Sequence, residues 1–391
     1  MTEKHIICKN CIMVEGFLGI EINEDQLCNF CADPNHVNPN WSKKIISEQQ
    51  KKEGLENWNN SVRAMQRAHD GEHYDCIIGY SGGKDSTALV DTFMNEYHLN
   101  PLLITIDTGF MTEVAKENMK ETLTIMDLFD NHLMIEDSIP TFTKLYHYFF
   151  FSHDSREKSL TVDVCHKCTD LIHTISYKQA LSRNIPYVII GFSPDQIARY
   201  FYETSTKDII KDGTPITALQ TFLGKKDLQW FLTPEEIEKM NDFSPRVLYP
   251  YHVIDYDEQE IINRLESKKL IQKGRGDPVL TNCHVVKAAL LHDLYRYGGI
   301  TYALQYAELV RQEGDPERHN QSRKSWLRTY KQIGKSILNG TFNVEGMEAF
   351  FANLGITKEE LLQKIEEKRQ ADPNEDKILQ NIERIRTNKL R

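Results

Sequence analysis

The fold is decided by the stretch YDCIIGYSGGKDST, residues 74–87, in which an apolar run leads directly into a glycine-rich turn. Tyr74–Tyr80 is short and largely apolar, so it predicts a buried strand. Ser86–Leu99 predicts a helix directly after the turn, because its apolar residues recur at helical spacing: Leu89, Val90, Phe93, Met94 and Tyr97. A strand, a tight turn and a helix in this order indicate the first unit of a parallel sheet.

Further apolar runs predict four more strands, at Leu102–Ile106, His132–Ile135, Tyr187–Ile190 and, more weakly, Val247–Tyr249. Amphipathic stretches separate these runs. This alternation predicts an α/β fold, a parallel sheet with helices on both faces. From about Leu294 onward the pattern is almost wholly helical.

The turn SGGKDS, residues 81–86, has the properties of a phosphate-binding loop. Its two glycines allow a tight bend and a close approach of the backbone to a ligand. The helix that follows presents N–H groups and the positive end of its dipole to an anion. Lys84 adds a positive charge, and Ser81 and Ser86 add hydroxyl donors. The loop is not a Walker loop, because the four-residue spacer of that motif is missing.

The motif resembles the Ser-Gly-Gly-x-Asp-Ser signature of the PP-loop ATP pyrophosphatases, which lies at a first strand–helix junction. The resemblance implies a PP-loop (HUP-like) domain that cleaves ATP between the α and β phosphates with Mg²⁺. AMP is then linked to a substrate oxygen, and pyrophosphate is released. The resemblance also implies the residues that hold the pyrophosphate, with Lys84 and Asp85 as catalytic residues: Ser81, Gly82, Gly83, Lys84, Asp85 and Ser86.

Two strand ends are candidates for binding the rest of the nucleotide. Ligands of open α/β sheets lie beyond the carboxyl ends of the strands, so Asp107 and Thr108 are placed to meet the adenosine. The resemblance implies the same role, and a simple Asp-Thr-Gly turn is the alternative. Gly191 and Asp195 loosely fit the Gly-His-Asn-x-x-Asp-x-Ala motif of sulfur-inserting members, although Phe192-Ser193 replaces the His-Asn pair. We expect them near the adenylate.

The amino-terminal segment carries two Cys-x-x-Cys pairs with sixteen residues between them: Cys8, Cys11, Cys28 and Cys31. Two tight turns can present four thiolates tetrahedrally, which suits a structural Zn²⁺ site. Because so short a segment cannot bury a core, the metal would supply its folding free energy. Paired redox thiols are the alternative.

Three more cysteines, Cys165, Cys168 and the distant Cys283, form a second candidate set. Cys165 opens a helical pattern, and a helix amino terminus favours the thiolate. The order of these cysteines along the chain resembles the tRNA two-thiolation branch of the PP-loop group. That resemblance implies a [4Fe–4S] cluster with one iron open to sulfide. The alternatives are a persulfide relay at Cys165 or Cys168, a second zinc completed by His166 or His284, and inert packing.

The nucleophile that displaces AMP is therefore either sulfur or ammonia. We expect a sulfurtransferase that replaces a carbonyl or amide oxygen with sulfur from a sulfur donor. The zinc-ribbon segment with its GIEINED stretch, residues 19–25, resembles instead the N-acetyl-sugar amidotransferases. That resemblance implies ammonia from a partner glutaminase. A non-enzymatic ATP-binding scaffold is the third hypothesis.

Composition limits the partners and the location. The chain carries 47 Lys and Arg against 57 Asp and Glu, a net charge of −10. This charge disfavours nucleic acid and favours a small-molecule, sugar-nucleotide or carrier-bound substrate. The basic run Arg318–Lys335 reads first as a solvated helix face and second as a local anion patch. No apolar run approaches the ~20 residues of a membrane span, and Met1–Cys11 lacks a secretory signal, so we expect a cytoplasmic protein.

We expect four parts along the chain. These are a zinc ribbon over 1–33, a helical linker over 34–70, the PP-loop domain over 71–291 and a helical region over 292–391. The apolar stripes of the last region pack internally or form a homodimer.

Overall fold

The computed structural model of the chain describes residues 6–33, 36, 46–153, 158–194, 201–276, 283–387 and 389. The chain divides into two compact units. The helical unit consists of Met1–Lys43, Tyr146–Cys165 and His284–Arg391, and the sheet unit consists of Lys44–Leu145 and His166–Cys283. The four predicted domain ranges stay predictions.

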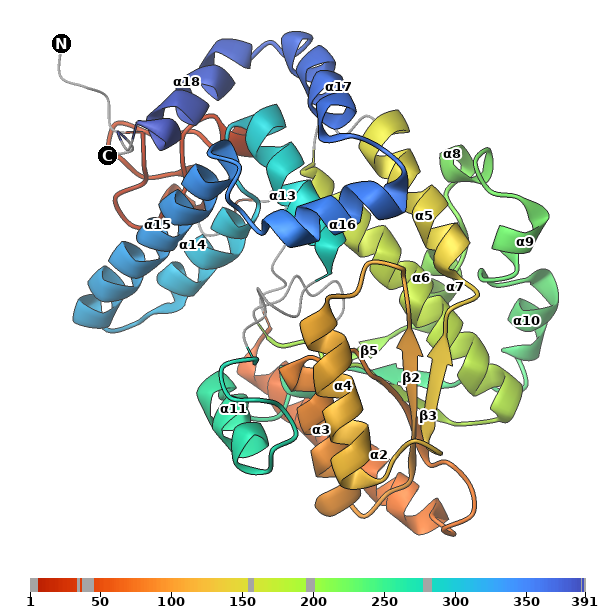
Figure 1. Ribbon diagram of the computed structural model, residues 1–391. Coiled ribbons are helices and arrows are strands. Elements are labelled where there is room, and N and C mark those ends of the chain that lie inside the picture. The colour runs from red at the N-terminus through yellow and green to blue at the C-terminus, as the bar shows by residue number, and fades with distance from the viewer. Residues whose placement is uncertain are drawn as a thin grey trace. The chain divides into compact units, whose positions relative to one another are not determined.

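The sheet unit contains a six-stranded sheet in the described part of the chain, with the order β3-β2-β1-β4-β6-β5. Figure 1 shows two of the neighbours, β2 and β3, side by side. The strands are β1 Cys76–Gly79, β2 Pro101–Ile106, β3 His132–Ile135, β4 Tyr187–Ile189, β5 Glu203–Thr204 and β6 Arg246–Leu248. All neighbours are parallel except the edge pair β5 and β6. The five predicted strands are confirmed, and the two-residue β5 was not predicted.

The helices of the sheet unit alternate with the strands, as the sequence predicts. They are α2 Glu48–Ala68, α3 Lys84–Asn95, α4 Glu113–Met126, α7 Thr206–Asp212, α8 Thr217–Gln220, α9 Lys225–Leu228, α10 Pro234–Lys239 and α11 Glu258–Ser267, with a 3-10 turn at Pro250–His252. Two helices run across the limits of the units: α5 Ile139–His147 and α6 Leu160–Arg183.

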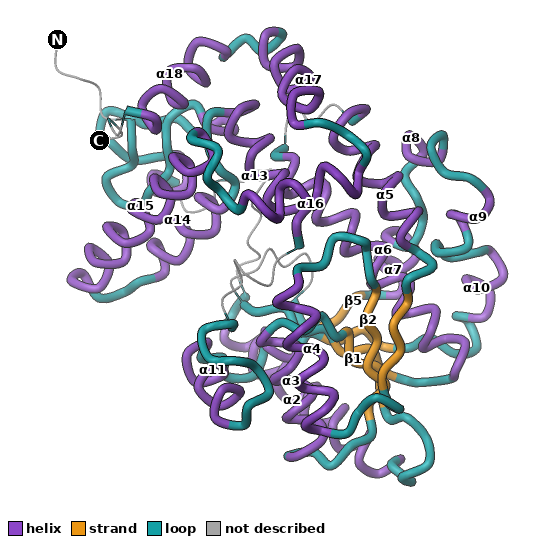
Figure 2. The backbone as a smooth tube through the Cα atoms, viewed as in Figure 1, coloured by secondary structure: helices purple, strands orange, loops and turns teal. Residues whose placement is uncertain are grey.

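Both faces of the sheet are buried. Cys76, Ile78 and Leu103 face a core to which α2, α3, α4 and α11 contribute, and Figure 2 shows α2, α3 and α4 together on one side of the strands. The side chains of Ile77 and Val188 point the other way and are equally buried. Burial on both faces explains why the strands read as continuous apolar runs and not as alternating ones.

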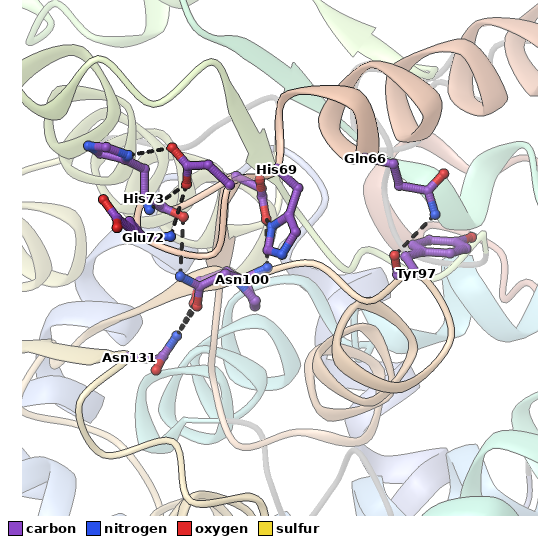
Figure 3. Close-up of polar contacts among 10 residues, drawn as sticks. Gln66, His69, Glu72, His73, Tyr97, Asn100 and Asn131 are labelled. Carbon is purple, nitrogen blue, oxygen red and sulfur yellow. Dashed lines mark hydrogen bonds and ion pairs between the residues drawn. The ribbon is translucent and has the colours of Figure 1, made fainter.

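Polar side chains at the amino ends of the strands hold neighbouring strands in place (Figure 3). Asp75, Asn100 and Asn131 each directly precede a strand. An Asp75 carboxylate oxygen accepts from the Asn100 backbone N–H at 2.6 Å and contacts the His69 ring at 2.8 Å, while the Asn131 amide donates to Asn100 at 2.6 Å. Ligands of such sheets bind at the opposite, carboxyl ends of the strands. We therefore assign this cluster a structural role, which is to hold neighbouring strands together.

The carboxyl-terminal part of the helical unit is helical, as the sequence predicts. Its helices are α1 Asn29–Ala32, α13 His284–Tyr297, α14 Tyr302–Gln312, α15 Pro316–Leu338, α16 Val344–Leu354, α17 Lys358–Gln370 and α18 Glu375–Arg386, with a 3-10 turn at Phe17–Gly19 and a π-helical turn at Tyr148–Ser152. Helix α13 is buried along most of its length and packs against α16, α17 and α18. The predicted fold class, a parallel α/β sheet with a four-cysteine segment and a helical carboxyl-terminal region, is confirmed.

The buried carboxylate of Asp293, on α13, determines where α6 begins. It accepts hydrogen bonds from the backbone N–H of Leu160 at 2.9 Å and from the hydroxyl of Thr161 at 2.6 Å. The Ser159 hydroxyl accepts from the N–H of Val162 at 3.1 Å. These acceptors satisfy N–H groups that have no partner within the helix.

No helix in the described ranges combines the length and the apolar character that a bilayer crossing requires.

Candidate functional site

The SGGKDS loop joins β1 to α3 and is shaped by a close contact with α4. Gly82 has φ +71°, and a Cβ at this position would lie 2.2 Å from the carbonyl oxygen of Ala115. Both the left-handed backbone and the lack of space therefore require glycine at this point. The buried Asn118 side chain, one turn further along α4, donates to the Gly82 carbonyl at 3.4 Å.

Hydrogen bonds inside the loop fix its two serines. The Ser86 hydroxyl donates to the Gly83 carbonyl at 3.1 Å and accepts from the Ser81 backbone N–H at 3.2 Å. The Gly83 N–H donates to the Ser81 hydroxyl at 3.4 Å. Helix α3 begins directly after Gly83, so its first N–H groups and its positive dipole end lie at the loop. The loop thus has a preformed backbone of the kind that binds phosphate.

The lysine of the loop is buried and surrounded by oxygens. The Lys84 ammonium lies 2.7 Å from the Asp85 carboxylate, 3.1 Å from the Tyr256 hydroxyl and 3.3 Å from the Glu258 carboxylate. Burial alone would lower the pKa of Lys84, but the charges of Asp85 and Glu258 outweigh it and raise that pKa. Lys84 is therefore a fixed cation at neutral pH.

The loop lies where the strand order reverses direction. β1 is flanked by β2 on one side and β4 on the other, and the carboxyl ends of β1 and β4 are where an α/β sheet binds its ligand. Gly191 follows β4 and supports the loop, since a Cβ there would lie 3.3 Å from the Ser86 nitrogen. Asp195 lies outside the described residues, so its predicted role stays a prediction.

At the end of β2, Asp107 closes a turn. Its carboxylate accepts from the Gly109 N–H at 2.7 Å, as the turn interpretation of this segment predicts. Thr108 is buried. The adenosine-binding role of these two residues stays a prediction.

The four amino-terminal cysteines are brought together in the helical unit. The sulfur atoms of Cys8, Cys11, Cys28 and Cys31 all lie within 4.8 Å of one another, and within the described ranges no other group of three or more metal-ligating side chains is gathered in this way. Backbone N–H groups donate to two of the sulfurs, from Cys28 to Cys8 at 3.3 Å and from Met13 to Cys11 at 3.5 Å. The donor set fits a metal ion, and four thiolates are the set that tetrahedral zinc prefers.

The proximity of the four thiols moves their pKa values apart. A hydrogen bond between Cys8 and Cys11 is the largest cause that lowers the pKa of Cys8. A separate hydrogen bond between Cys31 and Cys11 is the largest cause that lowers the pKa of Cys31, to about 7. A hydrogen bond with Cys28 raises the pKa of Cys11. A metal ion needs all four as thiolates, so binding at this site would release protons.

Two arginines from the carboxyl-terminal helices hold the cysteine segment. Arg323 on α15 donates to the carbonyls of both Cys8 and Cys11, at 2.7 and 2.8 Å. Arg311 on α14 contacts the Cys11 sulfur at 3.6 Å and lies over the Phe30 ring at 4.9 Å. Arg323 therefore does not belong to a solvated basic face, because it is bonded to the backbone of the first Cys-x-x-Cys turn.

The second cysteine set is placed differently from the prediction in one respect. Helix α6 begins at Leu160, five residues before Cys165, because Asp293 and Ser159 cap it there. Cys165 therefore does not open the helix, and this part of the prediction was wrong. Cys165 and Cys168 lie one turn apart on α6, whereas Cys283 directly precedes α13. Cys165 belongs to the helical unit and the other two to the sheet unit, so their joint role as metal ligands stays a prediction.

Sequence reasoning missed Tyr256, Glu258, Arg311 and Arg323 as parts of the two sites. Each acts through a partner more than 150 residues away in the sequence. No local motif marks such a partner. The sequence pointed to one of these four residues, because the basic run Arg318–Lys335 contains Arg323.

Comparison with known proteins gives limited similarity. No protein-family model matches the chain. The curated protein MJ1599 of Methanocaldococcus jannaschii, described as uncharacterized, is 28% identical over 122 residues, which cover 31% of this chain and 39% of that protein. The match therefore spans well under half of the relative's length.

A solved structure that resembles the chain is the U34-tRNA thiolase NcsA from Methanococcus maripaludis with its [4Fe–4S] cluster. The likeness covers 76% of this chain and 89% of that one, with 13% identity and a TM-score of 0.32. At that TM-score the superposition is loose.

Replacing Gly82 by alanine should disable the loop. The substitution adds a Cβ to a left-handed residue and against a carbonyl, so we expect a loss of about 3 kcal/mol or more in the free energy of unfolding. Gly71→Ala is the matched control, because Gly71 has φ +77° but nothing within 4 Å of its Cβ position. It should cost about 1–2 kcal/mol. Urea denaturation of both variants measures this, and equal losses would contradict the steric account.

Replacing Arg323 by alanine should loosen the cysteine segment. The variant loses two charge-assisted hydrogen bonds to buried carbonyls, so we expect a loss of about 3 kcal/mol. The neighbouring Lys324→Ala, on the exposed part of α15, should change stability by less than about 0.5 kcal/mol. Thermal unfolding, together with the metal content retained after dialysis, compares them. The predicted anchoring is wrong if the two variants behave alike.

Proposed function

We propose that the chain is an ATP-dependent adenylating enzyme that cleaves ATP between the α and β phosphates. The observation that carries this proposal is the SGGKDS loop at the carboxyl end of β1, with its glycine-dictated bend and the buried Lys84 ammonium beside it. A fixed cation, a helix amino terminus and oriented hydroxyls together suit a pyrophosphate that gains charge as it departs.

In this proposal Ser81–Ser86 hold the β and γ phosphates, and Asp107 and Thr108 meet the nucleoside. Mg²⁺ enters with the phosphates, since it is usually held by one or two carboxylates plus phosphate oxygens, and Asp85 is the carboxylate of the loop. The substrate oxygen attacks the α phosphorus, the bond to the β-phosphate oxygen breaks, and AMP stays on the substrate. Lys84 offsets the charge on the leaving pyrophosphate.

We propose sulfur as the nucleophile that then displaces AMP. Cys165, Cys168 and Cys283 supply the thiolates, and ammonia chemistry would need none. If they ligate a [4Fe–4S] cluster, three protein thiolates leave one iron open, where a cluster can bind and deliver sulfide. The product is a thiocarbonyl, and AMP is released.

Ammonia from a partner glutaminase is the second candidate. It is favoured by the four-cysteine segment, whose sulfurs are gathered and whose sequence resembles the N-acetyl-sugar amidotransferases. In both cases we propose Zn²⁺ at Cys8, Cys11, Cys28 and Cys31. That ion would stabilise the segment and take no part in the reaction.

Lys84→Ala should suppress ATP cleavage. Loss of the cation beside the leaving group should lower the rate of pyrophosphate release by about 100-fold or more, measured with candidate carbonyl or amide substrates. Lys116→Ala, which removes an exposed lysine of α4 paired with Glu113, is the control and should keep the wild-type rate. Unchanged turnover in Lys84→Ala, or ADP as the product, would overturn the proposed cleavage.

Cys168→Ala separates the sulfur hypothesis from the ammonia hypothesis. If sulfur is delivered there, the variant should release pyrophosphate at the wild-type rate but form no thiolated product. Thr169→Ala, the next residue of α6, should retain both steps. Iron and zinc assays on one anaerobic preparation complete the test, because a colourless, iron-free and active protein excludes the cluster. If both steps survive in Cys168→Ala, amidotransfer becomes the leading hypothesis.

A further inference from the structure

We propose that Glu258 belongs to the phosphate site and competes with bound phosphate for the ammonium of Lys84, while Tyr256 positions that ammonium. This inference rests on the proposed binding of ATP at the SGGKDS loop. Both residues come from the segment that enters α11, about 170 residues beyond the end of the loop in the sequence. They extend the site beyond the motif that defines it.

The hydrogen-bonding capacity of Lys84 is the starting point. An ammonium group has three protons. Three oxygens surround it: Asp85 Oδ2 at 2.7 Å, Tyr256 Oη at 3.1 Å and Glu258 Oε1 at 3.3 Å. A phosphate oxygen that bonds to Lys84 must therefore replace one of these three.

Tyr256 and Asp85 are fixed to each other and are poor candidates for replacement. The Tyr256 hydroxyl accepts from Lys84 and donates to Asp85 Oδ1 at 2.9 Å, so it bridges the two charged groups. Tyr251 donates to the Asp85 backbone carbonyl at 3.0 Å, and its ring packs edge-on against Tyr256 at 5.2 Å. These contacts hold Lys84 and Asp85 in one orientation, which makes Tyr256 a positioning residue.

Glu258 is the partner that phosphate can replace at least cost. Its side chain is 54% exposed, against 14% for Asp85 and 4% for Lys84. Its contact with Lys84 is the longest of the three. Because the Glu258 carboxylate is more than half exposed, it returns to water with less loss than the largely buried Asp85 carboxylate. A polyphosphate also repels Glu258, so its binding and the Lys84–Glu258 contact oppose each other.

The consequence is that Glu258 lowers the affinity of the loop for phosphates. Glu258→Gln should therefore bind ligand more tightly than wild type, whereas loss of a structural contact would weaken binding. The gain should be about two- to fivefold at low salt, the range of an exposed ion pair, and should shrink as salt screens the charge. Tyr256→Phe should bind more weakly, because Lys84 and Asp85 lose their bridge.

The test is equilibrium binding of inorganic pyrophosphate and of ATP to the full chain by calorimetry. Wild type, Glu258→Gln, Tyr256→Phe and the control Glu260→Gln are compared at two salt concentrations. Glu260 lies one half-turn along α11, is exposed and carries the same charge, so its variant corrects for the change in net charge. We expect Glu258→Gln to exceed the control in affinity for both ligands.

Three negative outcomes have different meanings. If wild type and all variants fail to bind pyrophosphate and ATP, the proposed function is wrong, and this inference with it. If wild type binds but Glu258→Gln binds no better than Glu260→Gln, the competition is wrong and the proposed function stands. A lower melting temperature for Glu258→Gln with weaker binding would assign the contact a structural role only.

Discussion

The buried ammonium of Lys84 is the charge on which the site of the sheet unit depends. It is the first residue of α3, so it lies at the positive end of a helix dipole and away from water, and both circumstances disfavour a cation. Asp85, Glu258 and Tyr256 compensate by surrounding it with oxygens. Under the proposed function, an incoming phosphate would supply negative charge at the same point. Burial and the helix dipole, which make the Lys84 cation unfavourable in the folded protein, also favour an anion beside it.

In the helical unit, side chains from distant helices hold the four-cysteine segment in place. The cysteine segment is too short to fold around a core of its own, and its four sulfurs gather only if the two turns are held in place. Arg323 binds the backbone of the first turn, and Arg311 lies over Phe30 in the second. In both units a short motif forms the candidate site, and a side chain from a distant part of the chain contacts it.

This division explains what the sequence could predict. The SGGKDS loop, the Cys-x-x-Cys pairs and the five longer strands depend on neighbouring residues, and each was found. The start of α6 was misplaced because Asp293, more than 130 residues later, caps Leu160. The edge strand β5 has only two residues, too few to show a pattern. Tyr256 and Glu258 join the loop only through the packing of α11 against α3, which no local spacing encodes.

The position of α6 also bears on the proposed chemistry of its cysteines. A helix dipole acts within about the first turn, so its effect on Cys165 and Cys168 is small now that α6 begins at Leu160. Lys167, between the two cysteines in sequence, is paired with the Asp170 carboxylate at 2.8 Å, so its charge is already offset. Coordination to a metal deprotonates a thiol outright and needs no helix dipole, so a cluster at these cysteines, which stays a proposal, is compatible with the observed start of α6.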